Sequence, residues 1–441
     1  MAIYKGNKKV VAVYKGSTPI NKIYKGVTLV FQKGGGGGNT HLFEGTATRN
    51  FNLRINGNQR IPITPDADGK WFYDTDEKIT SLGKAFYNQR NVTSVDLSNL
   101  DLTGISTNQM FNNSSNITSI KFNNTKSMKL VDVISMFSGC RALVSLDLSS
   151  FDTSNLTSVK SLFFGCSSLT SLDLSSFDTS NLTSATSLFK GCSSLVSLDL
   201  SNWNTSSLKD VISLFANCSS LVSLDLSNWN TSSLKSTAYL FEGCTSLKTV
   251  NLSNWNTSSL VDVSSSFRNC TSLETLDLSN FDFSNLKYVD YLFNGCSSLV
   301  SLNLGSFNPS VLQSAQSLFS YCSSLTSLDL SSFNPSELSN ASYLFEGCTS
   351  LKTVNLSNWN TSNLQRASSL FRDCTSLETL DLSNFDLSNA TDCSDIFYNC
   401  TSLSTIKCKQ AFKDWCITNQ NSIKLPTAMR EGGSGTWEIV G

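Results

Sequence analysis

Cysteine recurs at a fixed interval of 26 residues through most of this 441-residue chain. A strict period of this length indicates one supersecondary unit that repeats along the chain and stacks on its neighbours. A single globular core stops growing near about 250–300 residues, whereas a solenoid extends through contacts between adjacent repeats. The sequence therefore predicts a solenoid. The cysteines that set the period are Cys140, Cys166, Cys192, Cys218, Cys244, Cys270, Cys296, Cys322, Cys348, Cys374 and Cys400.

The segment 162–188 represents the repeating unit. Leu169, Leu172 and Leu174 give the pattern L-x-x-L-x-L, which is the strand signature of leucine-rich repeats. Alternation along the strand buries the last two leucines and turns the aspartate between them outward. A polar turn then leads to apolar residues at spacings of three to four, as on one face of a short helix, and Gly191 is placed to end that helix. The predicted fold class is α/β, with one strand and one short helix in each repeat.

Phenylalanine marks the repeats as clearly as cysteine does, because it stands three residues before each spaced cysteine. Phe86 and Phe111 extend the series toward the N-terminus, with Gln89 and Ser114 in the cysteine position. The sequence therefore predicts a solenoid of about thirteen repeats over residues 83–407. The other members of the series are Phe137, Phe163, Phe189, Phe215, Phe241, Phe267, Phe293, Phe319, Phe345, Phe371 and Phe397.

Short modules are expected to cover the two ends of the solenoid, which would otherwise present unpaired strand edges. Residues 41–82 are interpreted as a β-rich N-terminal cap, because Pro62, Pro65 and the segment 66–69 mark turns between alternating apolar stretches. Residues 408–441 are expected to form a C-terminal cap with a helix over 409–419 and a last strand over 436–440.

Two columns of side chains are predicted to be buried. Equivalent residues of stacked repeats lie about 4.8 Å apart, which is close enough for disulfides. An odd number of identical thiols argues instead for a reduced column that packs as small apolar groups, while the state of Cys393, Cys408 and Cys416 stays open. The second column is aromatic and follows the strand, where we expect a buried spine rather than an exposed row that stacks on sugars. Its members are Phe151, Phe177, Trp203, Trp229, Trp255, Phe281, Phe307, Phe333, Trp359 and Phe385.

A third column occupies the outward position of the strand and is the candidate binding face. Its acidic members are Asp147, Asp173, Asp199, Asp225, Asp277, Asp329 and Asp381, and its amides are Asn251, Asn303 and Asn355. Neighbouring like charges at this spacing repel by about 1 kcal/mol in water. The four consecutive acids at its start fit a bridging cation such as calcium, or a solvated column that shares hydrogen bonds with nearby hydroxyls. We favour the solvated column and predict no metal site.

Signals for catalysis are weak. His41 is the only histidine, so the chain has no histidine-based triad or histidine-rich metal cluster. Gly34–Gly38 lacks the flanking strand, helix and lysine of a phosphate-binding loop. We therefore expect no enzymatic activity and no cofactor. A net charge of −1 gives no reason to expect nucleic-acid binding, and no apolar run is long enough for membrane insertion.

A second, shorter period occupies the N-terminus. Tyr-Lys-Gly recurs every ten residues after a β-branched residue, which predicts three short strands. About thirty residues cannot bury a sufficient core alone, so residues 1–33 are interpreted as an anchor or oligomerisation segment. The alternative is a small hairpin cap without a partner. Residues 34–40 are interpreted as a flexible glycine linker. The candidate anchor residues are Tyr4, Lys5, Tyr14, Lys15, Tyr24 and Lys25.

The unit L-F-x-G-C-S-S-L-x-S-L-D-L-S-x-F/W-D/N-x-S resembles the surface-protein repeat of the BspA-like leucine-rich-repeat family, over about residues 83–407. This resemblance implies a non-enzymatic surface or adhesion role in bacteria and their phages. The Tyr-Lys-Gly segment is similar to N-terminal segments of structural proteins from phages of gut bacteria. Because residues after Met1 lack the apolar stretch of a signal peptide, we expect assembly in the cytoplasm of a bacterial host.

These resemblances lead to one expectation and one alternative. The expected protein is a structural or adhesion component of a bacteriophage virion, such as a fibre or appendage. It is expected to be a homo-oligomer that binds other virion proteins through its N-terminal segment and contacts a host-surface glycan or protein through its repeats. The alternative is a bacterial surface adhesin or a secreted protein-interaction protein.

Overall fold

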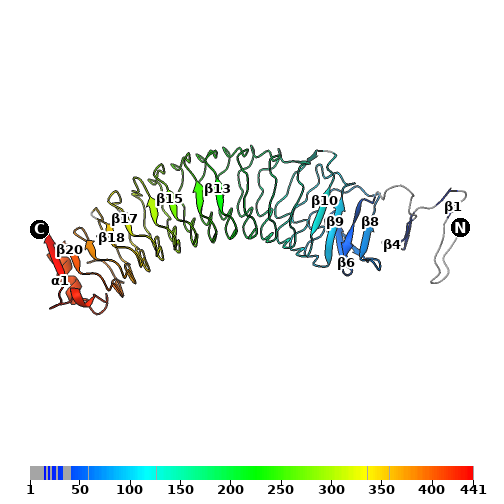
Figure 1. Ribbon diagram of the computed structural model, residues 1–441. Coiled ribbons are helices and arrows are strands. Elements are labelled where there is room, and N and C mark those ends of the chain that lie inside the picture. The colour runs from blue at the N-terminus through cyan, green and yellow to red at the C-terminus, as the bar shows by residue number, and fades with distance from the viewer. Residues whose placement is uncertain are drawn as a thin grey trace.

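The computed structural model describes residues 41–440 except 58, 126, 335 and 357, together with the short segments 14–15, 18–19, 22–25 and 28–32. Residues 41–440 form one curved stack of repeats, which begins with the strands around β5 and ends at α1 and β21 (Figure 1). The predicted leucine-rich-repeat solenoid is confirmed.

The described N-terminal segments form two antiparallel hairpins, where the sequence predicted three strands. Tyr14 pairs with Pro19, and Lys25 pairs with Thr28. Tyr4 and Lys5 lie outside the described residues, whereas Tyr14 and Lys15 belong to β1, and Tyr24 and Lys25 to β3. The strands are β1 (Tyr14–Lys15), β2 (Thr18–Pro19), β3 (Lys22–Lys25) and β4 (Thr28–Gln32).

The first repeats are covered by an antiparallel cap. β5 lies between β8 and β9, and β10 continues the sheet parallel to β9. A hairpin of β6 and β7 covers a second part of the first repeat, because Arg54 N–H donates to the Ala85 carbonyl (3.0 Å) and Asn56 N–H to the Ser81 carbonyl (2.8 Å). The strands are β5 (Phe43–Ala47), β6 (Phe51–Ile55), β7 (Gln59–Ile63), β8 (Lys70–Tyr73), β9 (Val92–Leu97) and β10 (Ser119–Phe122).

One side of the stack carries short parallel strands in which equivalent residues of successive repeats lie opposite one another. Leu224 pairs with Val250, and Asp225 pairs with Asn251. Because this offset is one repeat, each side-chain position forms a straight column. The strands are β13 (Ser223–Asp225), β14 (Thr249–Asn251), β15 (Thr275–Asp277), β16 (Ser301–Asn303), β17 (Ser327–Asp329), β18 (Thr353–Asn355), β19 (Thr379–Asp381) and β20 (Thr405–Lys409). A separate parallel pair, β11 (Met128–Lys129) and β12 (Phe151–Asp152), lies at the aromatic position that follows the strand.

A second ladder of backbone hydrogen bonds joins the turn segments, which we define as residues 158–165 and their equivalents before each spaced cysteine. Phe163 N–H donates to the Leu188 carbonyl of the next repeat (3.0 Å). Cys166 N–H instead closes a tight turn on the Phe163 carbonyl three residues earlier (3.1 Å). N–H groups that bond to the next repeat alternate with N–H groups that close a local turn. The backbone of each repeat is therefore hydrogen-bonded to its neighbour in the turn segments as well as in the strands.

The short helix expected in each repeat is wrong, and the turn segment takes its place. Ser161 and Gly165 have left-handed backbone conformations, with φ of 54° and 68°. L-residues form right-handed helices, and an α-helix needs every N–H to bond four residues back. Gly191, which was expected to end the helix, has a φ of 77° at the equivalent turn. Half of the N–H groups serve the neighbouring repeat, so no helix can form in the segment.

The core is a continuous stack of phenylalanine rings with the cysteines beside it. Phe215 and Phe267 flank Phe241 with ring centroids 5.5 Å away on each side, and such contacts run from Phe86 to Phe397. All eleven spaced cysteines are buried and free, as predicted. Their thiols donate to the carbonyl of the phenylalanine 29 residues earlier, at 2.9–3.3 Å. The thiols therefore link adjacent repeats without disulfides.

The aromatic column after the strand is a buried spine, as predicted. Trp203 and Trp229 stack with ring centroids 6.1 Å apart and nearly parallel planes, and Trp255 continues the stack at 6.4 Å. Phe281 is the half-buried member, and the other nine are buried. Large aromatic side chains contribute much of the apolar area that each thin repeat can bury.

The last repeats are closed by strand and helix together. β21 adds to β20 in parallel, so the sheet order is β19-β20-β21. Phe397 N–H donates to the Ile423 carbonyl (2.9 Å), which extends the ladder of turn segments beyond the last cysteine repeat. The cap consists of α1 (Gln410–Thr418), a 3₁₀ turn over Thr427–Met429 and β21 (Thr436–Val440).

Candidate functional site

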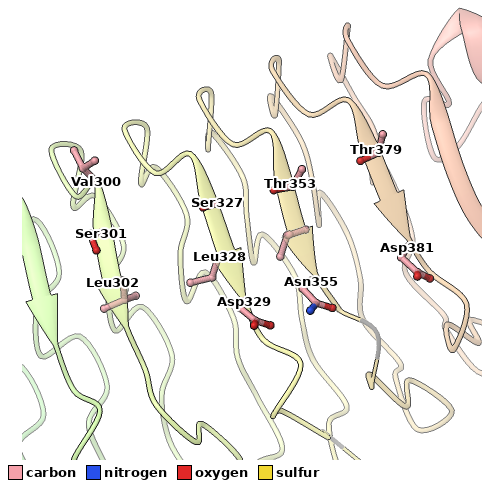
Figure 2. Close-up of a pocket in the computed structure, with 11 residues that line it drawn as sticks. Val300, Ser301, Leu302, Ser327, Leu328, Asp329, Thr353, Asn355, Thr379 and Asp381 are labelled. Atoms are coloured by element: carbon pink, nitrogen blue, oxygen red, sulfur yellow. The ribbon is translucent and has the colours of Figure 1, made fainter.

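The predicted acidic column lies on the strand face, which we define as the outward side chains of residues 171–175 and their equivalents. Figure 2 shows Asp329, Asn355 and Asp381 in one row on neighbouring strands, beside a row of hydroxyl residues two positions earlier. Six of the seven predicted aspartates are exposed, and Asp381 is half-buried. The structure therefore brings all seven into one continuous surface feature.

Each aspartate of this row is also a local turn acceptor. The Asp173 carboxylate accepts a hydrogen bond from the Ser175 backbone N–H at 2.9 Å, and Asp225 accepts one from Ser227 at the same distance. These backbone N–H groups, followed by the serine hydroxyls, hold the pKa of both carboxyls below the usual value. The D-L-S sequence thus fixes the orientation of the carboxylates before any ligand arrives.

Amides separate the acids in the second half of the row. Asp225 faces Asn251, and Asp329 faces Asn355, so like charges are not adjacent. At the C-terminal end, Lys407 Nζ lies 2.8 Å from the Asp381 carboxylate. Burial acts to raise the pKa of Asp381, but the Lys407 ion pair and hydrogen bonds from its own turn hold that pKa below the usual value.

The four consecutive acids at the start of the row have no such separation. Hydrogen bonds from Ser149 and Ser201 hold the pKa of Asp147 and Asp199 below the usual value, and the charge of Asp173 opposes this lowering. Within the residues that the structure describes, no group of three or more histidine, cysteine or acidic side chains converges as metal ligands do. The acids form a row along the stack rather than a coordination sphere.

Shallow grooves run along the strand face. The groove shown in Figure 2 has a volume of about 540 Å³ and spans four neighbouring repeats. Val300 lies at its rim, and equivalent valines are exposed on other repeats, so the face mixes hydroxyl, amide, acidic and small apolar groups. The exposed equivalents of Val300 are Val144, Val196 and Val222.

His41 belongs to the N-terminal cap rather than to a catalytic group. Its Nδ1 lies 2.9 Å from the Asp74 carboxylate, and its ring stacks on Phe72 with centroids 4.2 Å apart. The Asp74 carboxylate also accepts the backbone N–H of Leu42 at 2.8 Å. These contacts connect the residues before β5 to the end of β8, so the role of His41 is to stabilise the cap.

Sequence reasoning missed a second exposed surface, the turn face, which consists of the exposed side chains of the turn segments. Tyr239, Tyr291 and Tyr343 occupy the same left-handed position in every second repeat, with φ of 59°, 59° and 61°. The repeats between them carry serine at that position. Left-handed backbone costs an L-residue roughly 1–2 kcal/mol, and it is rarer still for a bulky side chain.

The signal that could have revealed this surface is the placement of tyrosine. Eleven tyrosines occur in the chain, and six of them fall in turn segments between residues 239 and 398. Five of these six are exposed, and Tyr291 is half-buried. The six residues are Tyr239, Tyr288, Tyr291, Tyr321, Tyr343 and Tyr398.

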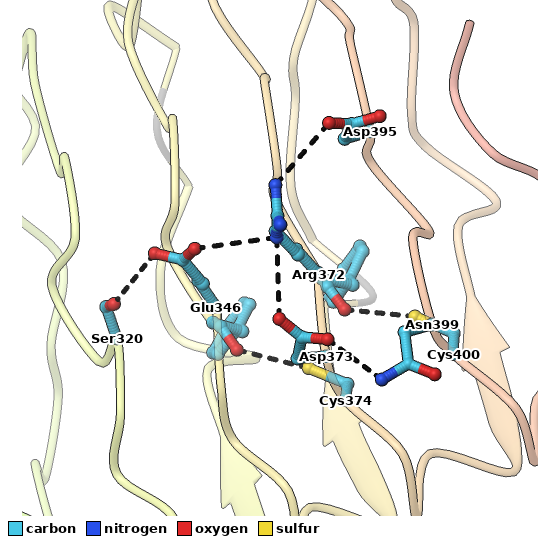
Figure 3. A network of polar contacts seen from close by, with 10 residues as sticks. Ser320, Glu346, Arg372, Asp373, Cys374, Asp395, Asn399 and Cys400 are labelled. Atoms are coloured by element: carbon cyan, nitrogen blue, oxygen red, sulfur yellow. Dashed lines mark hydrogen bonds and ion pairs between the residues drawn. The ribbon is translucent and has the colours of Figure 1, made fainter.

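Charged side chains bridge neighbouring repeats on the turn face (Figure 3). The Arg372 guanidinium lies 3.4 Å from Asp373, 3.5 Å from Asp395 and 3.8 Å from Glu346. It also lies over the Tyr398 ring, 4.6 Å from the centroid. Burial raises the pKa of Glu346, while Arg372 opposes that rise. The cluster places one arginine among three carboxylates, so the acids are in excess.

An equivalent cluster occurs four repeats earlier. Arg268 lies 3.5 Å from Glu242, and its guanidinium sits 5.3 Å from the centroid of the Tyr291 ring. The Tyr291 hydroxyl accepts a hydrogen bond from the Gln316 amide at 2.6 Å. The same combination of tyrosine, arginine and acid therefore occurs twice on this surface.

The repeat sequence matches a known protein family. Matches to the family described as "Mycoplasma protein of unknown function, DUF285" cover residues 80–193, 105–223, 131–250, 211–327 and 313–425. These overlapping matches span the solenoid. The chain belongs to the DUF285 family. This assignment confirms the expected repeat family of BspA-like type, while the description assigns no activity to DUF285 proteins.

Comparison with solved structures gives weak overall superpositions. A leucine-rich repeat protein from Eubacterium ventriosum is 16% identical, with a TM-score of 0.43, over 80% of this DUF285 chain and 96% of the other. A chain of the TLR13–ssRNA13 complex is 23% identical, with a TM-score of 0.29, over 75% of this chain and 50% of that chain. The DUF285 chain thus spans half the length of that structure.

The functional domain of InlJ from Listeria monocytogenes, described as including a cysteine ladder, is 19% identical with a TM-score of 0.20. The match covers 75% of this chain and 68% of that domain. No curated protein matches the chain significantly. Neither the family description nor these titles names a catalytic activity. Among the described residues, no helix is both long and apolar enough to cross a membrane.

Proposed function

We propose that this chain is a non-enzymatic adhesion scaffold of a bacteriophage virion, anchored by its N-terminal segment and displaying the repeats toward a host surface. The observation that carries the adhesion role is the strand face. The outward side chains from Asp147 to Asp381 are held in one row by turn hydrogen bonds. A rigid, preorganised surface of this length suits an extended partner, because little conformational entropy is lost on binding.

The virion part of the proposal is supported by the N-terminus. Residues 1–33 contain seven lysines and no acid, and five glycines follow from Gly34 to Gly38. A short basic segment followed by a run of glycines is suited to docking on a larger assembly or to joining several copies of the chain. The Tyr-Lys-Gly period is similar to anchors of phage structural proteins, which makes other virion proteins the proposed partners.

Deletion of residues 1–33 tests this proposal. In phage produced with the shortened chain, we expect the protein to be missing from purified particles while the isolated protein keeps its circular dichroism spectrum and melting temperature. A scrambled N-terminal segment of the same composition is the matched control and is also expected to be missing. Particles that carry the shortened chain at normal levels contradict the anchor.

A bacterial surface adhesin is the second candidate, and the family description favours it because it refers to proteins of a bacterium. Antibody labelling of intact cells and of purified particles separates the two candidates. Labelling confined to particles supports the virion role, whereas labelling of growing cells in the absence of phage supports the adhesin. In both cases the repeats are expected to carry the contacts with the partner.

A further inference from the structure

We propose that the turn face between residues 239 and 398 binds an extended, uncharged glycan, with Tyr239, Tyr291 and Tyr343 stacking on sugar rings. This inference deepens the proposed adhesion role and rests on it. It assigns the recognition to the turn face, whereas the sequence pointed only to the strand face.

The first argument is that folding does not require tyrosine at these positions. Ser213, Ser265 and Ser317 occupy the equivalent sites in the intervening repeats with the same left-handed backbone, at φ of 54–56°. Tyr239 and Tyr343 leave 40% and 36% of their surface exposed, whereas Tyr291 is half-buried with the Arg268 guanidinium over its ring. A bulky residue in a disfavoured conformation that adds little packing is a mark of function rather than of stability.

The second argument is spacing. Tyr239, Tyr291 and Tyr343 stand two repeats apart. The phenylalanine rings two residues after this position lie 5.5–5.9 Å apart in adjacent repeats, so the tyrosines recur at about 11 Å. In an extended β-1,4-linked glycan, alternate sugar rings recur at a comparable distance. A periodic protein surface in this register can engage a periodic polymer at several sites at once, which multiplies weak individual contacts.

The third argument is the chemistry between the rings. Protein interfaces have a dry apolar core, but the groups that surround these tyrosines are polar or charged. The Gln316 amide donates to the Tyr291 hydroxyl at 2.6 Å, and the Asn340 amide donates to Gln316 at 3.2 Å. Rings separated by amides and hydroxyls suit a sugar, which has an apolar face and hydroxyl edges.

The fourth argument concerns charge. Glu242 pairs with Arg268, and Glu346 pairs with Arg372, but acids outnumber bases along the turn segments between residues 239 and 398. Such a surface repels an anionic partner, which favours an uncharged glycan over an acidic one. The planar guanidinium groups keep donors directed along the face, and these donors suit sugar hydroxyls.

Calorimetric titration of the full chain with chitohexaose and with cellohexaose tests the inference. We expect at least one hexasaccharide to bind, and the triple variant Tyr239→Ser, Tyr291→Ser, Tyr343→Ser to weaken that binding by roughly tenfold or more. Serine is the native residue in neighbouring repeats, so the variant is expected to keep the melting temperature. A wild-type chain that binds neither sugar, or a serine variant with unchanged affinity, overturns the proposal.

A control on the strand face shows which surface is responsible. The variant Asp225→Asn, Asp277→Asn, Asp329→Asn copies the asparagines of alternate repeats and tests whether the strand face, rather than the turn face, holds the hexasaccharide. Loss of sugar binding in this variant, with binding intact in the serine variant, assigns recognition to the strand face and overturns the inference.

Binding to cells of the host strain distinguishes failure of this inference from failure of the adhesion role. Equal binding of the wild type and the serine variant rejects the glycan site while adhesion stands. Cell binding that protease treatment of the cells abolishes, and that free hexasaccharide does not compete with, identifies a protein partner and also rejects the glycan site. Absence of cell binding by the wild type rejects adhesion itself.

Discussion

At the scale of single residues, each spaced cysteine is a small apolar group that also donates a hydrogen bond. The Cys270 thiol donates to the Phe241 carbonyl at 3.2 Å. Ser114 occupies the same position in an earlier repeat, and its hydroxyl donates to the Phe86 carbonyl. The position therefore selects for a compact donor, and cysteine adds apolar character that suits a site with no solvent access.

Burial of these thiols predicts sensitivity to alkaline pH. Desolvation raises the pKa of Cys192, Cys244 and Cys296 to about 12. The thiol of an unfolded chain ionises at about pH 8.5. The stabilisation that comes from burying the protonated thiol is therefore fully present below that pH and is lost as the pH rises toward the folded pKa. In this pH range each buried thiol lowers the free energy of unfolding by about 1.4 kcal/mol per pH unit. We expect melting temperature under reducing conditions to fall steeply from pH 8.5 to 10.5.

Serine variants provide the control for this pH dependence. Replacing Cys192 and Cys244 by serine removes two titrating groups and keeps a donor, so the fall with pH becomes shallower. A melting temperature that does not change up to pH 10.5 contradicts ionisation-linked unfolding.

The tryptophan spine supplies a second residue-scale prediction. Trp255 Nε1–H donates to the Leu226 carbonyl at 3.0 Å, whereas the buried Trp229 Nε1–H has no hydrogen-bond partner. Both rings stack in the same column, so Trp→Phe removes similar apolar area at each site. We expect Trp255→Phe to cost about 1 kcal/mol more than Trp229→Phe in urea unfolding followed by circular dichroism. Equal costs, or the reverse order, contradict this account of the indole hydrogen bond.

At the scale of the element, the sequence predicted the strand correctly from β13 onward and the turn segment incorrectly. Alternation favours a half-buried strand, as in Thr275–Asp277, but residues 171–174 carry the same alternation without forming a strand. Apolar spacings of three to four describe a helix, but they equally describe tight turns that close on the third residue back. Ser161 gave no signal for its left-handed backbone, because serine is not typical of that conformation.

Of the two candidate binding surfaces, the strand face could be predicted from the sequence and the turn face could not. The column from Asp147 to Asp381 follows from periodicity, because a fixed register forces equivalent residues onto one face. The turn face could not be predicted, because its definition depends on backbone conformation and on which turn positions reach solvent. Tyrosine placement between residues 239 and 398 is a sequence signal, but it acquires meaning only after the turns are known.

Two glycines of one column test the turn geometry. Gly165 and Gly347 have φ of 68° and 71°, but a Cβ at Gly165 would lie 3.9 Å from Gly139, whereas a Cβ at Gly347 would lie 2.5 Å from the Tyr321 ring. Gly165→Ala is expected to cost about 1–2 kcal/mol from backbone conformation alone. Gly347→Ala is expected to cost about 1–3 kcal/mol more, measured by urea unfolding, because the ring must move.

A double variant isolates the contact with the ring. Tyr321→Ser in the Gly347→Ala background removes the clash, so the cost is expected to return toward that of Gly165→Ala. A Gly347→Ala cost that Tyr321→Ser leaves unchanged indicates that backbone strain, and not the ring, determines the effect.

At the scale of the whole molecule, stability passes from repeat to repeat through one continuous core. Phe86 to Phe397 form an unbroken ring stack, and both backbone ladders connect only adjacent repeats. Caps close this array at β5–β8 and at α1–β21, where a bare repeat would expose apolar surface and strand edges. Such an array behaves as a one-dimensional system whose cooperativity depends on every interface being intact.

The position of a defect should therefore decide how the molecule unfolds. Phe241 contacts rings on both sides at 5.5 Å, whereas Phe397 is the last ring of the stack and contacts Phe371 at 5.9 Å. Phenylalanine to alanine in a core costs about 3–5 kcal/mol, so Phe241→Ala weakens two interfaces in the middle of the array. We expect its urea unfolding to separate into two transitions, because the repeats on each side then unfold independently.

The matched variant Phe397→Ala is expected to lose only the protection of the last repeats. Hydrogen exchange should show faster exchange beyond about residue 370 while the central repeats keep their protection, since stability in such an array is local. A single transition of unchanged steepness in both variants would mean that the caps, rather than the contacts between neighbouring repeats, set the cooperativity of the rod.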